Sequence, residues 1–260
     1  MNPILKSPEQ IDPEYKAVLE RMCSMLTEVF KSKLIAFYYY GSLARGDMHS
    51  KSDIDTVAIV DGEDEAILRK NSEELSAQIN VEFRSAKFEV ACISNVTASR
   101  ADWVAIMKSG AVLFSGEDFY SDLPYEKNPA VLIDAAYKKY FITSPGGLLV
   151  RLKKFETDYL NKQPISDDFI ADTTQYFAKS FLRLGIAVCI KRTGNVALFT
   201  HDPLIAKATI SEITPELREY CEISEEFRVS ATQNNDPSIL FKLCQGIKGI
   251  LDEIEPLMKF

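Results

Sequence analysis

The sequence predicts an α+β protein in which an N-terminal α/β domain, residues 1–120, precedes an all-α helical bundle, residues 121–260. In the first half, short segments typical of strands alternate with helical patterns, whereas almost all of the second half has helical periodicity. Between the halves, residues 115–128 (SGEDFYSDLPYEKN) lack apolar periodicity and are rich in turn formers, as expected of a linker. The length of 260 residues also agrees with two domains.

An amphipathic helix is predicted at the start of the first domain. Asp12 is a suitable N-cap, and Pro13 fits the first helical position. The apolar residues that follow recur at helical spacing: Val18, Met22, Met25 and Val29. We therefore expect one face of this helix to pack on the domain core.

Strands and helices then alternate. The predicted strands are residues 34–40 (LIAFYYY), 53–60 (DIDTVAIV), 87–93 (KFEVACI) and 111–114 (AVLF). The acidic cluster DGEDE opens a helix that runs to about Ile79, and another helix is expected from about residue 99 to 109. This order is typical of a sheet covered by helices.

Helices fill the second domain. One is expected at residues 148–160, and a long one from residue 166 to 192 ends at Thr193-Gly194. Three shorter helices are expected to begin at N-cap residues followed by proline: Asp202, Thr214 and Asp236.

Composition excludes several classes of protein. The 46% of hydrophobic and 26% of charged residues are inconsistent with a disordered or fibrous chain. A formal net charge of -8 argues against nucleic acid or an anionic membrane as a partner. No apolar stretch approaches the roughly 20 residues of a membrane span, and no signal peptide is apparent. The five cysteines are widely spaced and form no CxxC pair, so we expect reduced thiols in a cytoplasmic protein.

The residues that suggest chemistry follow the first strand. Gly41 comes directly after it and permits close approach of the backbone to a ligand, while the following helix start offers amide donors to phosphate. Ser42 adds a hydroxyl at the same place. Asp53 and Asp55 lie two apart on the next strand, so both carboxylates project from one face. Such a pair suits Mg²⁺ or Mn²⁺, and the neighbouring phosphate cradle suggests phosphoryl chemistry.

A third carboxylate is expected from a neighbouring strand, and Glu89 is the best candidate. It lies among residues expected to be buried, where an unpaired carboxylate is costly unless a metal ion is near. Glu82, in a more polar segment that reads as a loop or edge, is the alternative.

This pattern resembles the polymerase-beta-type nucleotidyltransferase superfamily, and within it the aminoglycoside nucleotidyltransferases of the small-molecule branch. The resemblance rests on Gly41-Ser42, on Asp53-x-Asp55 after ten intervening residues and on Glu89, and it covers residues 38–93. It implies a mixed sheet in a nucleotidyltransferase domain, and transfer of a nucleoside monophosphate, most simply AMP from ATP, to a hydroxyl with release of pyrophosphate.

The resemblance also implies roles for single residues. Asp53 and Asp55 would hold two Mg²⁺ ions, and Glu89 would bind the catalytic metal, act as general base, or do both. Gly41 and Ser42 would hold the β- and γ-phosphates, and Arg45 would add a contact unless it only lies along the surface of its helix.

Basic residues of the helical domain often complete the triphosphate site in the resembled group. Lys179 and Arg183 are the candidates here, because with Tyr176 they share one face of the long helix, although pairing with acids such as Asp172 is an equal alternative. Streptomycin-type relatives carry an arginine shortly before a Thr-Gly and a lysine shortly after it. Here Arg183 lies further upstream of Thr193-Gly194, and no lysine follows in ALFTHDP.

The sequence leaves three functions open. The first is nucleotidyl transfer to a small polar, aminoglycoside-like acceptor, with the active site between the two domains. The second is nucleotidylylation of a protein by the same chemistry. The third is a non-catalytic, antitoxin-like nucleotide-binding module, against which the complete set of Asp53, Asp55 and Glu89 argues.

Overall fold

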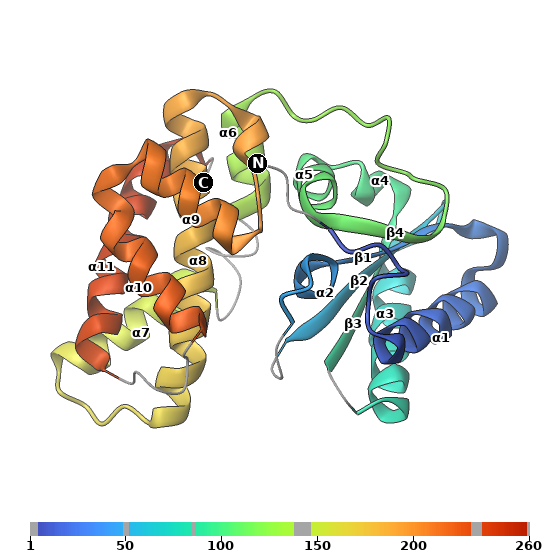
Figure 1. The fold of residues 1–260 in the computed structure, drawn as a ribbon, viewed down its shortest axis with the longest axis horizontal. Helices are drawn as coiled ribbons and strands as arrows, with labels where there is room; N and C mark the ends of the chain where they lie inside the picture. Colours follow the sequence, from blue (N-terminus) through green and yellow to red (C-terminus); the bar gives the residue numbers. More distant parts are fainter. Residues whose placement is uncertain (1–4, 49–51, 85–86, 138–146, 230–235, 259–260) are drawn as a thin grey trace. The chain divides into compact units, whose positions relative to one another are not determined.

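The protein consists of two compact units, Met1–Tyr125 and Glu126–Phe260, in a computed structural model that describes residues 5–48, 52–84, 87–137, 147–229 and 236–258 (Figure 1). The division lies inside the segment predicted as a linker. The first unit contains a sheet with helices on both faces, and the second consists of helices and short 3₁₀ turns.

A four-stranded mixed sheet forms the centre of the first unit. Its strands are β1 (Leu34–Tyr40), β2 (Asp53–Val60), β3 (Lys87–Ser94) and β4 (Ala111–Gly116). They are arranged in the order β3-β2-β1-β4. β1 is antiparallel to β2 and β4, whereas β2 and β3 are parallel. The predicted α+β class with a mixed sheet is therefore confirmed.

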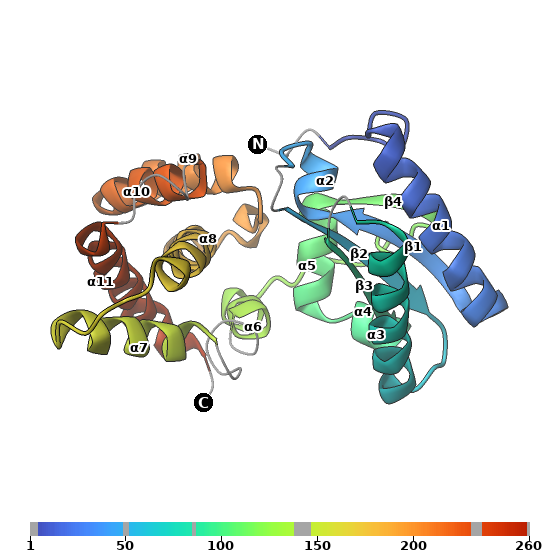
Figure 2. The ribbon, with the colours of Figure 1, turned by 90° about the horizontal axis from the view of Figure 1, so that it is seen from below.

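Helices cover both faces of this sheet (Figure 1). α1 (Pro13–Phe30) and α3 (Glu65–Glu82) pack on one face, where the buried side chains of alternate strand residues meet them, among them Phe37, Ile54 and Phe88. α4 (Asn95–Ala98) and α5 (Ala101–Gly110) pack on the other face. Figure 2 shows the same two layers from below.

The first helix begins as predicted, but one of the four residues predicted on its buried face is exposed. The Asp12 carboxylate accepts a hydrogen bond from the Glu14 N–H at 2.9 Å, and Pro13 occupies the first helical position. Val18, Met22 and Met25 are buried in the core. Val29 is 46% exposed, so its assignment to the apolar face was wrong.

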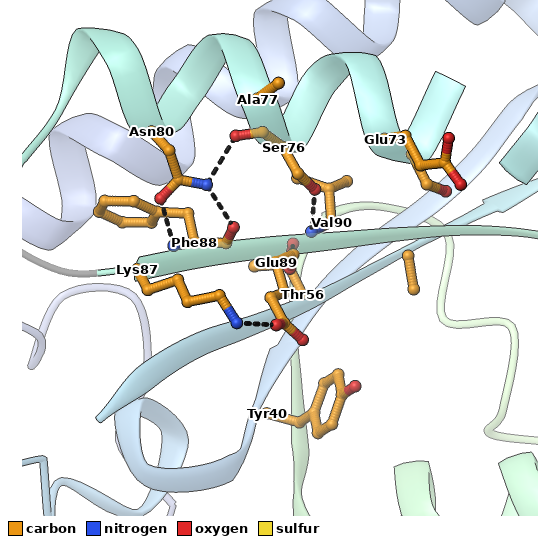
Figure 3. A pocket seen from close by; sticks show the side chains of 12 residues that line it. Tyr40, Thr56, Glu73, Ser76, Ala77, Asn80, Lys87, Phe88, Glu89 and Val90 are labelled. Atoms are coloured by element: carbon orange, nitrogen blue, oxygen red, sulfur yellow. Dashed lines mark hydrogen bonds and ion pairs between the residues drawn. The ribbon is translucent and has the colours of Figure 1, made fainter. Parts of the chain in front are cut away.

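Side chains of α3 hydrogen-bond to the outer edge of β3 (Figure 3). The Asn80 amide accepts from the Phe88 N–H at 2.9 Å and donates to the Phe88 carbonyl at 2.8 Å. Ser76 Oγ accepts from the Val90 N–H at 3.0 Å, and Ser72 Oγ accepts from the Cys92 N–H at 2.7 Å. The three side chains are spaced by four residues and so lie on one helical face. They supply β3 with the partners that a further strand would give.

The second unit contains six α-helices within the described part of the chain. They are α6 (Pro129–Ile133), α7 (Leu148–Leu160), α8 (Asp167–Thr193), α9 (Pro203–Ile213), α10 (Arg218–Val229) and α11 (Pro237–Ile254). The long helix α8 contacts α9, α10 and α11. It ends at Thr193 with Gly194 in the left-handed conformation, as predicted.

The three predicted N-cap residues stand at helix starts, and in two of them the side chain makes the capping hydrogen bond. Asp202 and Asp236 accept backbone hydrogen bonds at the starts of α9 and α11. Thr214 stands at the N-cap position before Pro215, but its side chain accepts no backbone hydrogen bond there, and its hydroxyl donates back to the Ile210 carbonyl at 2.7 Å. A 3₁₀ turn, Pro215–Leu217, follows it, and α10 begins only at Arg218.

The cysteines are free thiols, as expected. Four of the five are buried, and Cys23 is partly buried. Burial raises the pKa of the Cys92 thiol to about 11, which keeps it protonated and unreactive near neutral pH. No helix in the described ranges has the length and apolar character needed to cross a membrane.

Asn80→Ala is expected to loosen β3. The substitution leaves the Phe88 N–H and C=O without the amide, at a cost of about 1–2 kcal/mol. Hydrogen exchange over β3, followed by mass spectrometry, should therefore accelerate by roughly 5- to 30-fold. Asn71→Ala, on the same helix but with no side-chain bond to β3, is the control. Equal exchange in the two variants would contradict the role given to the amide.

Candidate active site

The register of the sheet aligns the predicted acidic residues. Asp55 of β2 lies opposite Tyr40 of β1 and opposite Glu89 of β3. Asp53 lies opposite Lys87 in the same parallel pair. Paired residues on neighbouring strands project from the same face, with Cβ atoms about 5 Å apart. The structure therefore places Asp53, Asp55 and Glu89 on one face of two adjacent strands, with Asp55 and Glu89 directly paired.

These residues lie on the face that carries α4 and α5, at the end of the sheet that the two helices leave open. Further along the same face, α4 and α5 cover the buried side chains of Val57, Ile59 and Ile93. Nearer the strand ends, the side chains of Asp53 and Glu89 are 46% and 53% exposed. The carboxylates thus combine fixed backbone positions with access from solvent.

Gly41 is required next to Asp55. It has a φ of +73°, a conformation that favours glycine. A Cβ atom at this position would lie 2.8 Å from Asp55 Oδ2. The glycine therefore permits both the turn after β1 and the close approach of backbone to carboxylate.

The segment after Gly41 is a short helix, α2 (Gly41–Arg45), that ends at Gly46 in the left-handed conformation. The sequence predicts a helix at this point whose amide donors and positive end would face a phosphate. With five residues the helix has few aligned peptide dipoles, so only the local amides and the Ser42 hydroxyl are strong candidates for phosphate contact. Arg45 pairs with Asp47 at 3.3 Å and has a side chain only 16% exposed.

Glu89 has the expected register but not the expected environment. The prediction placed it among buried residues, yet side chains of β3 alternate and its own is 53% exposed. Its position is set by pairing with Asp55 and by Thr56, whose buried hydroxyl donates to the Glu89 carbonyl at 2.9 Å. Burial cost was therefore the wrong reason for choosing this residue.

The alternative carboxylate lies elsewhere. Glu82 is the last residue of α3, not part of a loop or edge strand. It pairs with Arg21 of α1 at 3.1 Å. The structure does not bring it to the row formed by Asp55 and Glu89.

Lys87 is a component of the site that the sequence argument missed. Its ammonium donates to Glu89 Oε1 (Figure 3). It also lies 4.0 Å from Asp53 Oδ2. The hydrogen bond to Glu89 and the charges of Glu89, Asp53 and Asp55 raise the pKa of Lys87, while burial opposes this. The signal was present in the sequence, because Lys87 precedes Glu89 by two residues and so shares its strand face.

A hollow of about 360 Å³ extends from this row along the outer edge of β3. Tyr40, Lys87 and Glu89 line it on the sheet, and Glu73 and Ser76 line it on α3 (Figure 3). Its walls carry both carboxylates and hydroxyls.

Asp53, Asp55 and Glu89, here called the acidic row, provide ligands that suit a hard divalent cation. Asp53, Asp55 and Glu89 offer carboxylate oxygens from adjacent strands, and two of their side chains are exposed enough to change rotamer. Among the described residues, no three metal-binding side chains already stand close enough to form a finished metal site. In the structure it is the Lys87 ammonium that lies among these oxygens.

Lys179 and Arg183 belong to α8 of the second unit. Lys179 is exposed and Arg183 is partly buried. Asp172, a possible partner of either, pairs with Arg151 at 2.7 Å. The same Arg151 guanidinium lies 4.4 Å from the ring centre of Tyr176. Burial raises the pKa of Tyr176, and the charges of Arg151 and Arg183 oppose the rise, so cationic groups gather around this ring.

Comparison with known proteins agrees with the architecture. Residues 18–108 match the family model described as nucleotidyltransferase domain. A solved structure, the spectinomycin adenyltransferase AAD(9) from Enterococcus faecialis with ATP and spectinomycin, matches with a TM-score of 0.54 at 15% sequence identity. The match covers 92% of this chain and 98% of that one. No curated protein matches the chain.

Gly41→Ala is expected to destabilise the protein more than the same change at Gly62. Both glycines have positive φ, but a Cβ at Gly62 meets nothing within 4 Å. Backbone strain of about 1–2 kcal/mol is therefore common to both, and only Gly41→Ala adds contact with Asp55, worth a further ~1 kcal/mol or more. Urea unfolding measures the difference. A Gly41→Ala variant as stable as Gly62→Ala would refute the close contact.

Proposed function

Starting from the nucleotidyltransferase domain that residues 18–108 form, we propose that this enzyme transfers a nucleoside monophosphate, most simply AMP from ATP, to a hydroxyl of a small polar molecule. One observation carries the proposal: Asp55 and Glu89 are paired on adjacent strands, and Asp53 projects from the same face. Gly41 lies directly against Asp55. This is the order of elements on which the resemblance to aminoglycoside nucleotidyltransferases rests.

The reaction forms one bond and breaks one. The acceptor hydroxyl oxygen attacks the α-phosphorus of the nucleotide, and the bond from that phosphorus to the bridging oxygen breaks, so that pyrophosphate leaves. Glu89 accepts the proton of the hydroxyl, a role suited to its exposed carboxylate. The contribution of divalent cations held by Asp53, Asp55 and Glu89, two Mg²⁺ or Mn²⁺ ions, would be to neutralise charge that develops during in-line displacement.

Backbone and side chains near α2 are proposed to orient the nucleotide. The Gly41 amide and the Ser42 hydroxyl would donate to the β- and γ-phosphates, where the absence of a Cβ at Gly41 allows close approach. Arg45 would have to leave Asp47 to reach a phosphate. We therefore assign it a smaller part than Gly41 and Ser42.

The acceptor is proposed to be aminoglycoside-like. The AAD(9) structure that shares the fold contains ATP and spectinomycin, which supports ATP and a compact polar acceptor here. The net charge of -8 supports a small molecule over a nucleic acid, because a polyanion would be repelled. The carboxylates lining the hollow also favour a neutral or cationic acceptor.

Pyrophosphate release tests the proposed function. The purified protein is incubated with each NTP and Mg²⁺ across a panel of aminoglycosides, spectinomycin and lincosamides. Acceptor-dependent release supports small-molecule transfer. Labelling of proteins in a cell extract, without release on the panel, favours protein nucleotidylylation. Nucleotide binding with neither reaction favours a non-catalytic module.

Glu89→Gln, Asp53→Asn and Asp55→Asn are each expected to lower turnover by about 10³-fold or more, because each removes a charge needed in the transition state. Glu82→Gln serves as the matched control, since it changes an acid that pairs with Arg21 instead. It should retain turnover near that of the unmodified enzyme. Full activity in either aspartate variant would overturn the mechanism.

Lys179→Gln and Arg183→Gln are expected to raise KM for the nucleotide by about tenfold, because a charge-assisted phosphate contact is lost. We propose that Lys179 and Arg183 bind the triphosphate and take no part in the chemical step, so kcat should change less. Lys153→Gln, which removes an exposed lysine of α7, is the control. Steady-state kinetics with varied NTP measure both constants, and an unchanged KM in both variants would remove these residues from the site.

A further inference from the structure

Lys87 lies beside two acidic residues of the candidate site, Asp53 and Glu89. Parallel pairing sets it opposite Asp53, and strand alternation sets it on the same face as Glu89. Its ammonium contacts Glu89 Oε1 and lies 4.0 Å from Asp53 Oδ2. A single positive charge thus joins acids from two strands.

The ammonium and a divalent cation compete for the same oxygen. A magnesium or manganese ion binds carboxylate oxygens at about 2.0–2.2 Å and takes up the lone pairs that face it. Glu89 Oε1 is already an acceptor for Lys87. Binding of the metal ion at this carboxylate therefore requires the ammonium to withdraw.

The Lys87 side chain is able to withdraw. It is 61% exposed, and its flexible stem of four methylene groups leads to a compact charge that is easily rehydrated. When a metal ion takes its place, moving the ammonium out costs only an exposed ion pair. Without it, the three acids on this face would repel one another.

We propose that Lys87 is a built-in counter-ion of the acidic row, which holds the carboxylates together in the metal-free protein and weakens binding of divalent cations by direct competition. The inference rests on the proposed function, because it takes Asp53, Asp55 and Glu89 as the metal ligands. It assigns a specific purpose to a lysine that the proposed reaction does not use. Removal of the Lys87 charge should therefore strengthen the binding of divalent cations by the three carboxylates.

Binding of Mn²⁺, followed by electron paramagnetic resonance in the absence of nucleotide, tests the inference. Lys87→Met removes the charge and keeps most of the stem, and we expect it to bind Mn²⁺ about three- to tenfold more tightly than the unmodified protein. Lys87→Arg keeps the charge and should resemble the unmodified protein. Lys33→Met is the matched control, because Lys33 pairs with Glu63 beside the opposite end of β1.

Thermal unfolding adds a readout that does not depend on catalysis. With a chelator present, Lys87→Met should unfold at a lower temperature than Lys33→Met, and Mn²⁺ should close that gap. Equal or weaker Mn²⁺ binding by Lys87→Met overturns the counter-ion role and leaves the proposed function standing. Failure of every variant to bind Mn²⁺ overturns both the role and the metal ligands on which the proposed mechanism depends.

Discussion

The parallel pairing of β3 with β2 is the constraint on which the site depends. It sets Asp55 opposite Glu89 and Asp53 opposite Lys87, although these pairs are separated by more than thirty residues of chain. β3 is hydrogen-bonded on both sides: it pairs with β2 along one edge, and along the other its backbone N–H groups donate to Asn80, Ser76 and Ser72 of α3. A slip of one residue would turn Glu89 to the core and Phe88 to the site, so the buried Phe88 and Val90 enforce the register.

Local patterns were enough to predict much of the fold and to propose several residues of the candidate site. Gly41, Asp53 and Asp55 were found because strand alternation and a glycine after a strand are properties of short segments. The mixed character of the sheet was implied only by the resemblance. Glu89 was expected on a strand next to that of Asp55 and lies there, opposite Asp55, but the burial argued for it is contradicted by its 53% exposure. Lys87 is not marked by the acidic pattern, because its place in the site follows from its pairing opposite Asp53, which the sequence does not specify.

The errors elsewhere have a common physical origin. Val29 has the correct helical spacing but lies in the last turn of α1, where the chain turns toward β1 and its side chain remains in solvent. Thr214 has the sequence of an N-cap, yet its hydroxyl bonds to the preceding helix. In each case tertiary neighbours, which a sequence pattern does not specify, decided the outcome.

The hydrogen bonds between β3 and side chains of α3 affect whether copies of this protein can associate through their sheets. An edge strand usually presents unpaired amides that can recruit a strand from another molecule. Here the outward amides of Phe88, Val90 and Cys92 already have acceptors, supplied by side chains of the same unit. A strand from another copy of the protein therefore finds few free amides to pair with along β3. This edge, which also carries Glu89, is protected from β-type self-association and stays accessible to small ligands.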